Sequence, residues 1–165
     1  MRQVSLCLLI KENKGSITEI LLAMKKRGFG QGRWNGVGGK TDIEKGETVF
    51  DSAIREAEEE IGVKIKNPEK AAIIDFYFPE QPKEKNWDQQ VHLFLVKEWE
   101  GEPIESEEML PKWFEIGKIP FDEMWDDDRY WLPHILEGKK LKAKFSFDKE
   151  DRTIEKIIEL VEKLD

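Results

Sequence analysis

The chain has 165 residues, of which 35 are acidic, 27 are basic and one is cysteine, and its formal net charge is −8. This length favours one domain, 1–165, with its own core, and a single cysteine excludes a disulfide framework and a thiolate zinc cluster. The acidic balance argues against a nucleic-acid polymer as partner, but metal ions can bridge carboxylates to a small phosphorylated ligand.

The first apolar run, residues 4–10, is too short to span a bilayer, and it lacks a basic leader and a small-residue cleavage site. We therefore expect a cytoplasmic protein that contacts no membrane, and we expect it to be a monomer.

The first half of the chain predicts a hairpin, a glycine-rich segment and a helix. Residues 4–10 and 17–24 are apolar runs of strand length on either side of the turn-like residues 13–16. Residues 25–40 contain six glycines, which is typical of turns or of close approach to the backbone. A helix is predicted over residues 48–61, with Thr48 as N-cap, Asp51 completing a capping box and Gly62 ending it.

The second half predicts strands at residues 71–78, 91–99, 113–116 and 141–147, with a loop over 101–111. A short helix is predicted over 129–136, with Pro133 disturbing it. A terminal helix is predicted over 151–164, because five aliphatic residues fall on one face: Ile154, Ile157, Ile158, Val161 and Leu164. Strands before, between and after helices predict an α/β sandwich.

The helix over 48–61 has an apolar arc of four residues: Phe50, Ile54, Ala57 and Ile61. Glu56, Glu59 and Glu60 share a different arc, since residues three and four apart are neighbours on a helix. Three such carboxylates repel one another unless a cation neutralises them, and Mg²⁺ prefers oxygen ligands. Arg55 precedes Glu59 by four residues and can orient its carboxylate. The alternative interpretation is a solvated acidic face.

The segments around this helix resemble the Nudix box, a Gly…Glu…Arg-Glu-aliphatic-x-Glu-Glu-x-Gly-aliphatic pattern. The matching residues are Gly39, Glu47, Arg55, Glu56, Ala57, Glu59, Glu60, Gly62 and Val63. The spacing departs once, because seven residues, 40–46, replace the family's five and lengthen the loop before the helix. The carboxylate triad keeps the family spacing.

The resemblance implies a Nudix α/β/α sandwich with a mixed β-sheet. It also implies metal-dependent hydrolysis of a nucleoside diphosphate linked to another moiety, with Glu56, Glu59 and Glu60 binding Mg²⁺ or Mn²⁺. The metal would polarise a phosphoryl oxygen and lower the pKa of the attacking water. A triphosphate would yield a monophosphate and pyrophosphate. Glu108 matches a further family carboxylate, either a metal ligand or a base toward the water.

Further blocks resemble the MutT-homologue branch, which hydrolyses oxidised purine nucleoside triphosphates and so sanitises the nucleotide pool. These blocks are residues 24–30, 32–36, 105–109, 113–114, 119–121 and 124–131, in the same order as in the branch. The resemblance implies a purine pocket that tolerates both 8-oxoguanine and 2-hydroxyadenine. Lys25 would contact the substrate, and Ser5 lies where the branch has a hydroxyl residue near the base.

Purine recognition needs flat apolar surfaces and a few polar groups at the base edge. Trp125 offers a stacking face, and three aromatic residues can complete the pocket: Phe29, Phe76 and Trp131. Asn35 carries both a donor and an acceptor. Asp127 and Asp128 are adjacent, so in a pocket one of them should hold a proton near neutral pH. Such a pair can match more than one base edge.

Two departures from the branch affect base recognition. Asp126 stands where the branch has proline, so a shift of one residue would change which two acids face the base. Gln89 and Gln90 replace an expected Met-Asp, and the loop over 79–90 is longer. The acidic run can instead be a helix N-terminus stabilised by the macrodipole.

Other singled-out residues have plain structural interpretations. Trp34, Trp113 and Trp131 can be core aromatics. His92 is expected to be structural, and Cys7 to be a small buried hydrophobe.

Three functions remain open from the sequence. The leading hypothesis is a Mg²⁺-dependent pyrophosphohydrolase acting on 8-oxo-dGTP and 2-hydroxy-dATP. The first alternative is a Nudix enzyme for another nucleoside diphosphate-linked substrate. The second is a Nudix module that binds a nucleotide without cleaving it, although such a module would be expected to lose box carboxylates.

Overall fold

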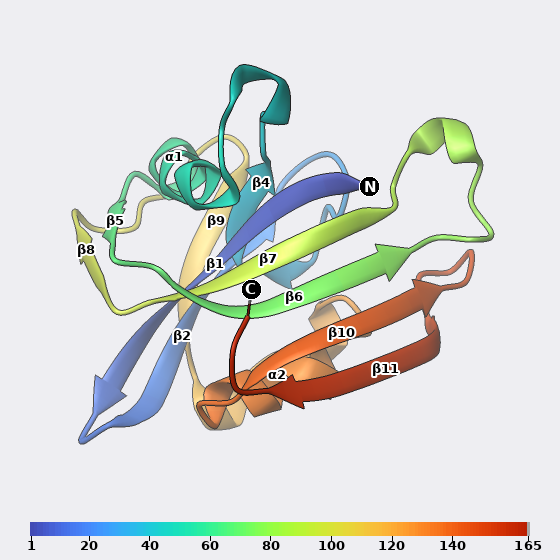
Figure 1. The fold of residues 1–165 in the computed structure, drawn as a ribbon. Helices are drawn as coiled ribbons and strands as arrows, with labels where there is room; N and C mark the ends of the chain where they lie inside the picture. Colours follow the sequence, from blue (N-terminus) through green and yellow to red (C-terminus); the bar gives the residue numbers. More distant parts are fainter. Residues whose placement is uncertain (165) are drawn as a thin grey trace.

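A computed structural model describes residues 1–164 and contains a mixed sheet with two α-helices (Figure 1). The helices are α1 (Val49–Ile61) and α2 (Asp128–Leu136). The strands are β1 (Arg2–Asn13), β2 (Ser16–Lys25), β3 (Trp34–Asn35), β4 (Val37–Lys40), β5 (Lys64–Lys66), β6 (Glu69–Tyr77), β7 (Gln89–Val96), β8 (Glu98–Glu100), β9 (Met109–Glu115), β10 (Lys140–Phe147) and β11 (Thr153–Val161). Neither helix is long and apolar enough to cross a membrane.

The strand order of the main sheet is β11-β10-β6-β7-β1-β2-β3, with β4 paired to β1 and β9 paired to β2. The pairs β1–β7 and β6–β10 are parallel, and the others in this sheet are antiparallel. The predicted hairpin of the first two strands is confirmed. The strand β1 is therefore central, and its first half lies between β4 and β7.

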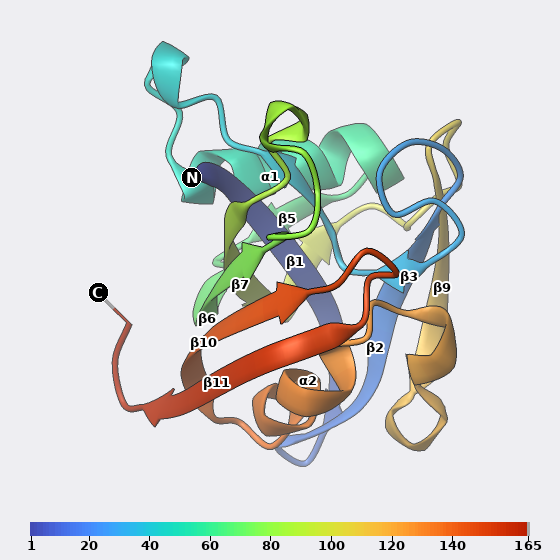
Figure 2. The same cartoon turned by 90° about the vertical axis from the view of Figure 1, so that its right-hand side faces the viewer.

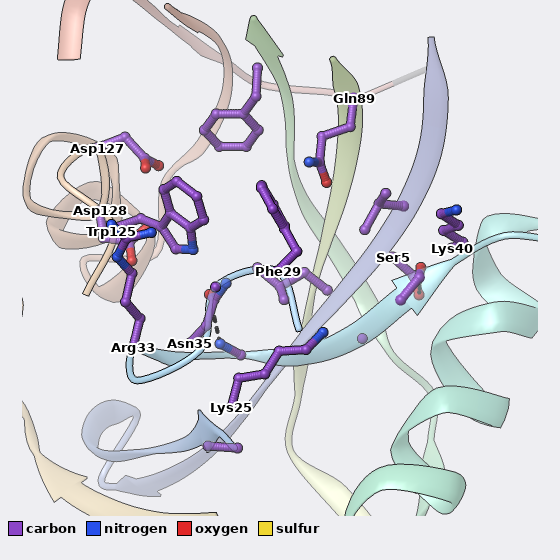
Figure 3. A pocket seen from close by; sticks show the side chains of 18 of the residues that line it. Ser5, Lys25, Phe29, Arg33, Asn35, Lys40, Gln89, Trp125, Asp127 and Asp128 are labelled. Atoms are coloured by element: carbon purple, nitrogen blue, oxygen red, sulfur yellow. Dashed lines mark hydrogen bonds between the residues drawn. The ribbon is translucent and has the colours of Figure 1, made fainter. Parts of the chain in front are cut away.

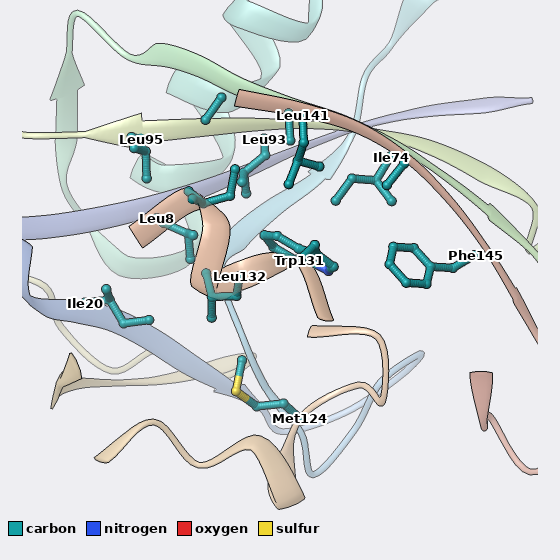
Figure 4. Packing of buried hydrophobic residues seen from close by; sticks show 14 of the residues in the cluster. Leu8, Ile20, Ile74, Leu93, Leu95, Met124, Trp131, Leu132, Leu141 and Phe145 are labelled. Atoms are coloured by element: carbon teal, nitrogen blue, oxygen red, sulfur yellow. The ribbon is translucent and has the colours of Figure 1, made fainter. Parts of the chain in front are cut away.

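Alternate residues of β1 enter two separate cores, one on each face of the sheet. Leu8 and Ile10 belong to the core that includes α2, which Figure 4 shows around Trp131 and Leu132. Cys7, which is fully buried, belongs to the core that includes α1. The two helices thus cover opposite faces (Figure 2). The predicted α/β/α sandwich with a mixed sheet is confirmed.

Helix α1 begins and ends as the sequence predicts. The hydroxyl of Thr48 accepts the Asp51 backbone N–H at 3.1 Å, and the Asp51 carboxylate accepts the Thr48 N–H at 3.3 Å. Gly62 follows the helix with φ +73°, a left-handed conformation that favours glycine. The buried face is rotated from the predicted arc, because Phe50 is 43% exposed while Ser52, Ala53 and Glu60 are buried together with Ala57 and Ile61.

The other predicted elements are present with shifted bounds. The predicted strand over 91–99 is divided into β7 and β8, and the short strand predicted at 113–116 is the end of the longer β9, which begins inside the predicted loop. Helix α2 contains Pro133. His92 is buried in β7, and its Nε2 lies 2.7 Å from Gln3 Oε1, so its environment is structural.

The predicted terminal helix is wrong, because residues 153–161 form the strand β11. This strand pairs with β10 along its whole length, from Lys140 opposite Val161 to Phe147 opposite Thr153. A helix here would leave the outer edge of β10 without hydrogen-bond partners. Several of the aliphatic residues also suit a strand with one half-covered face, where Ile158 packs on the core and Ile157 remains exposed.

Candidate active site

A cavity of about 280 Å³ opens between β1, β4, the glycine-rich loop 26–33, the ends of β6 and β7, and the start of α2 (Figure 3). All nine residues that the sequence assigns to substrate binding line it: Ser5, Lys25, Phe29, Asn35, Phe76, Trp125, Asp127, Asp128 and Trp131. These residues come from six separate segments of the chain, and the fold brings them together around one cavity.

Aromatic rings form one wall of the cavity. The ring centroids of Phe29 and Trp125 are 5.1 Å apart. Phe78 and Phe147 also line the cavity, and each contacts Trp125. Trp87, from the long loop between β6 and β7, packs on Phe29 at 4.9 Å. The loop that the sequence marks as longer thus supports this wall from outside.

The acidic pair forms a buried polar group in the same cavity. Asp127 is 1% exposed and Asp128 is 3% exposed. Burial raises the pKa of Asp127 to about 6, and burial together with the Asp127 charge raises the pKa of Asp128 well above its usual value. The indole N–H of Trp131 donates to Asp127 Oδ2 at 2.6 Å. The pair therefore holds a proton at neutral pH and presents both a donor and an acceptor.

Asp126 points away from the cavity. Its Oδ2 accepts the backbone N–H of Thr153 in β11 at 2.9 Å, and its Oδ1 lies 3.7 Å from Arg129 Nε. Of the three consecutive acids, Asp126 thus binds the backbone of β11, whereas Asp127 and Asp128 face the cavity. The acidic run also begins α2, so the helix-terminus interpretation and the pocket interpretation both describe it.

Asn35 and Ser5 lie on the side of the cavity formed by the first strands. The Asn35 Oδ1 atom accepts the Gly36 N–H at 2.8 Å, which fixes a side chain whose amide N–H groups can donate to a base edge. The Ser5 hydroxyl is fully buried and accepts a hydrogen bond from the Ser52 hydroxyl at 2.8 Å. Ser5 therefore connects the cavity wall to α1.

The box carboxylates of α1 lie beside the cavity, next to β4. Burial and then the Glu56 charge raise the pKa of Glu60 to about 8, while Lys25 acts in the opposite direction. Burial also raises the pKa of Glu56. The Oε2 atom of Glu60 is buried with no hydrogen-bond partner among residues 1–164.

The donor set fits a hard divalent ion. In the described part of the chain, no three acidic, histidine or cysteine side chains converge into a ready-made metal centre. Glu56 and Glu60 are nevertheless adjacent carboxylates whose ionised forms destabilise each other, and the unpartnered Glu60 oxygen adds a ligand. A cation bound there would satisfy that oxygen and relieve the repulsion.

Arg55 holds these carboxylates in place. It donates to Glu56 at 2.9 Å and to Glu59 at 3.1 Å, as the helical spacing predicts for Glu59. Its strongest partner is Glu47, which accepts from Nε at 2.7 Å and from Nη2 at 3.0 Å. These bonds lower the pKa of Glu47 to about 2. The sequence identifies Glu47 as a residue of the box, but it does not predict the hydrogen bonds between Glu47 and Arg55.

Gly39 lies directly against the carboxyl group of Glu56. A Cβ at this position would lie 2.5 Å from the Glu56 carboxyl group. The extra residues that follow form a short 3-10 turn, Ile43–Lys45, which ends at Gly46 with φ +79°. The longer loop thus leaves the contact between Gly39 and Glu56 intact.

Several residues of the site were missed by the sequence or lie differently from the expectation. Arg2, Arg33, Lys40, Phe78 and Phe147 line the cavity but were not predicted. Arg33, Lys40 and Phe78 stand close in sequence to the predicted Asn35, Gly39 and Phe76, which is the signal that could have pointed to them. Glu108 is 51% exposed along its side chain and pairs with Arg27 at 3.2 Å, although its charge contributes to the raised pKa of Glu60.

Comparison with known proteins finds a matching domain family and similar sequences. The NUDIX domain family matches residues 1–135. An oxidized purine nucleoside triphosphate hydrolase of Mus musculus is 46% identical over 132 residues, covering 80% of this chain and 81% of the mouse protein. The Danio rerio protein of the same name is 43% identical over 145 residues, covering 88% and 89%.

The fold is also shared with solved structures. A MutT protein from Bacillus halodurans has a TM-score of 0.80 at 24% sequence identity, and the match covers 96% of this chain and 98% of that chain. At this identity the match shows the common architecture alone.

Proposed function

This chain belongs to the Nudix family, and from that premise we propose that it hydrolyses oxidised purine nucleoside triphosphates to the monophosphate and pyrophosphate. The observation that carries the proposal is the buried Asp127–Asp128 pair, which lines an aromatic cavity together with Asn35. The names of the mouse and zebrafish relatives support the same substrate class.

The cavity would read the base through its polar groups. An oxidised purine differs from the normal base by a keto or hydroxyl group and by the proton that moves with it. Asp127 and Asp128 share a proton and so can both donate and accept, while the Asn35 amide can donate from another side. Trp125 and Phe29 would supply apolar surface for the ring. This combination supports recognition of both 8-oxo-dGTP and 2-hydroxy-dATP.

The phosphate chain would extend from the cavity toward α1, past Lys25. Nudix hydrolases generally use divalent metal ions, and for this chain we propose Mg²⁺, with Mn²⁺ as a substitute. Glu56, Glu59 and Glu60 would hold it, with Glu108 as a further ligand or as the base toward water. When bound, the ion polarises a phosphoryl oxygen and lowers the pKa of the attacking water.

The protein side chains have separate tasks around that ion. Glu60 must be ionised to bind the ion, and the positive charge of the ion would favour the ionised form over the protonated form that burial and Glu56 favour. Arg55 keeps Glu56 and Glu59 in position without entering the reaction. Lys25 would neutralise phosphate charge between the ion and the base.

We further propose that the chain acts as a monomeric, single-domain enzyme in the cytoplasm and takes a small nucleotide as its partner. The relatives act on small-molecule nucleotides, which supports the last part.

The test is steady-state hydrolysis with Mg²⁺, comparing 8-oxo-dGTP, 2-hydroxy-dATP, dGTP and dATP, with pyrophosphate as the readout. A large kcat/KM preference for either oxidised purine supports the proposal. Equal values for all four would retain the hydrolase but reject recognition of the oxidised base, and would favour another Nudix substrate. Binding without turnover would favour the binding module.

A further inference from the structure

The wall of the cavity is built from three segments that are far apart in the sequence. They are the loop that contains Arg33, the segment of Trp125 to Asp128 that begins α2, and the hairpin of β10 and β11. Figure 2 shows the turn of that hairpin reaching toward β3, next to the glycine-rich loop. Side-chain contacts between these segments are therefore needed to fix the orientation of the Trp125 ring.

Arg33 contacts both of the other segments. Its guanidinium carbon lies 4.1 Å from the centroid of the Trp125 ring, in cation–π geometry. Its Nη2 atom donates to Asp151 Oδ2 at 3.1 Å, across 118 positions of the sequence. The two side chains are only 31% and 24% exposed, so water screens this pair less than a surface ion pair. Figure 3 shows Arg33 beside Trp125 and Asp128.

Hydrogen bonds within the turn that carries Asp151 define its backbone conformation. The Asp148 carboxylate accepts the backbone N–H groups of Glu150 at 2.8 Å and of Arg152 at 3.0 Å. Asp151 itself has φ +61°, in the left-handed region where glycine would fit more easily. Aspartate and asparagine adopt this region more readily than most other residues, and here the Asp151 carboxylate accepts from Arg33.

We propose that Arg33, fixed by Asp151, is a positioning residue that holds the Trp125 ring and sets the affinity for the purine base. The inference rests on the proposed function, because it assigns these residues to binding of the oxidised purine. Arg33 stacks on the ring and lines the cavity, whereas the box carboxylates that would bind the metal lie on α1. Its loss therefore affects substrate binding and leaves the phosphorus chemistry intact.

The experiment compares Asp151→Asn with Glu150→Gln, a matched control in the same turn. Glu150 has a side chain that is 72% exposed and pairs with Arg152, so its neutralisation changes the charge without touching Arg33. The measurements are kcat and KM for 8-oxo-dGTP, the Kd of 8-oxo-dGMP without metal, and the thermal midpoint. We expect Asp151→Asn to raise KM and Kd about three- to tenfold, with kcat changed less than about twofold. Glu150→Gln should match the unsubstituted protein.

Arg33 variants provide a second arm. Arg33→Gln should raise KM as much as Asp151→Asn or more, and the double variant should be no worse than Arg33→Gln alone, because the pair acts as a unit. Arg33→Lys keeps the charge but lacks the planar stacking surface, so it should restore only part of the affinity.

Two results would overturn the inference. One is an Asp151→Asn variant with the KM and Kd of Glu150→Gln, even if its thermal midpoint falls, because the pair would then be structural only. The other is additive effects of the two substitutions. If the unsubstituted protein hydrolyses no oxidised purine triphosphate, the proposed function fails by itself, independently of how the variants compare.

Discussion

The stability of Asp127→Asn, relative to that of the native protein, is expected to be higher at neutral pH than at acidic pH. Burial raises the pKa of Asp127 from 3.8 to about 6, so the folded chain keeps a proton that the unfolded chain has released. The stability linked to that proton is fully present below about pH 4 and is lost as the pH rises through about 6. Asparagine cannot ionise, so the variant avoids this loss.

The magnitude follows from the two pKa values. The interval from 3.8 to about 6 corresponds to about 3 kcal/mol once the carboxylate is fully ionised, of which about 2 kcal/mol falls between about pH 4.5 and about pH 7.5. The asparagine Oδ1 can still accept the Trp131 indole N–H, which lies 2.6 Å away in the native protein. Removing the Asp127 charge also favours ionisation of Asp128, which adds to the effect in the same direction.

The assay is urea unfolding of both proteins at about pH 4.5 and about pH 7.5. The free energy of unfolding of Asp127→Asn, relative to the native protein, should rise by about 2 kcal/mol between these two conditions. Asp126→Asn is the control: burial would raise the pKa of Asp126, but the backbone N–H of Thr153 and the charge of Arg129 outweigh it and lower the pKa. The stability linked to a lowered pKa changes only below about pH 4, so the stability difference of this variant should be nearly the same at both pH values. An Asp127→Asn advantage that is equal at both pH values would show that the Asp127 proton does not contribute to the stability of the fold.

Three further predictions concern single side chains. Gly39→Ala would place a Cβ 2.5 Å from the Glu56 carboxyl group, so kcat should fall at least about tenfold in a folded protein, measured by pyrophosphate release and circular dichroism. Trp131→Phe removes the donor to Asp127, so the pH dependence of KM for 8-oxo-dGTP should move upward by about one pH unit. Cys7 is fully buried with a pKa raised by burial to about 12, so a thiol reagent should label it only after unfolding in urea.

The features that the sequence predicts well are local ones. The capping box at Thr48, Gly62 after the helix and the spacing of the carboxylates all lie within one continuous segment, so helix α1 and its acidic arc follow from short-range rules. The set of cavity residues was predictable for a different reason, since it rests on blocks that resemble a known family.

The features that the sequence misses depend on distant pairing. The residues of β11 have helical spacing, but β10 offers an edge that only an extended partner can complete. The direction of Asp126 depends on Thr153 of that same strand, so it could not be predicted while a helix was expected there. The contact of Arg33 with Asp151 was missed for the same reason. Arg33 precedes β3 and Asp151 precedes β11, and these strands stand at the two ends of the strand order.

We propose that α1 performs the phosphorus chemistry and that the cavity recognises the base. The most direct test is the separate measurement of kcat and KM for 8-oxo-dGTP in Glu60→Gln and Asn35→Ala. Glu60→Gln should lower kcat by at least about 100-fold with little change in base affinity, and Asn35→Ala should raise KM about tenfold with a smaller effect on kcat. Equal losses of kcat and of affinity in both variants would contradict this proposal.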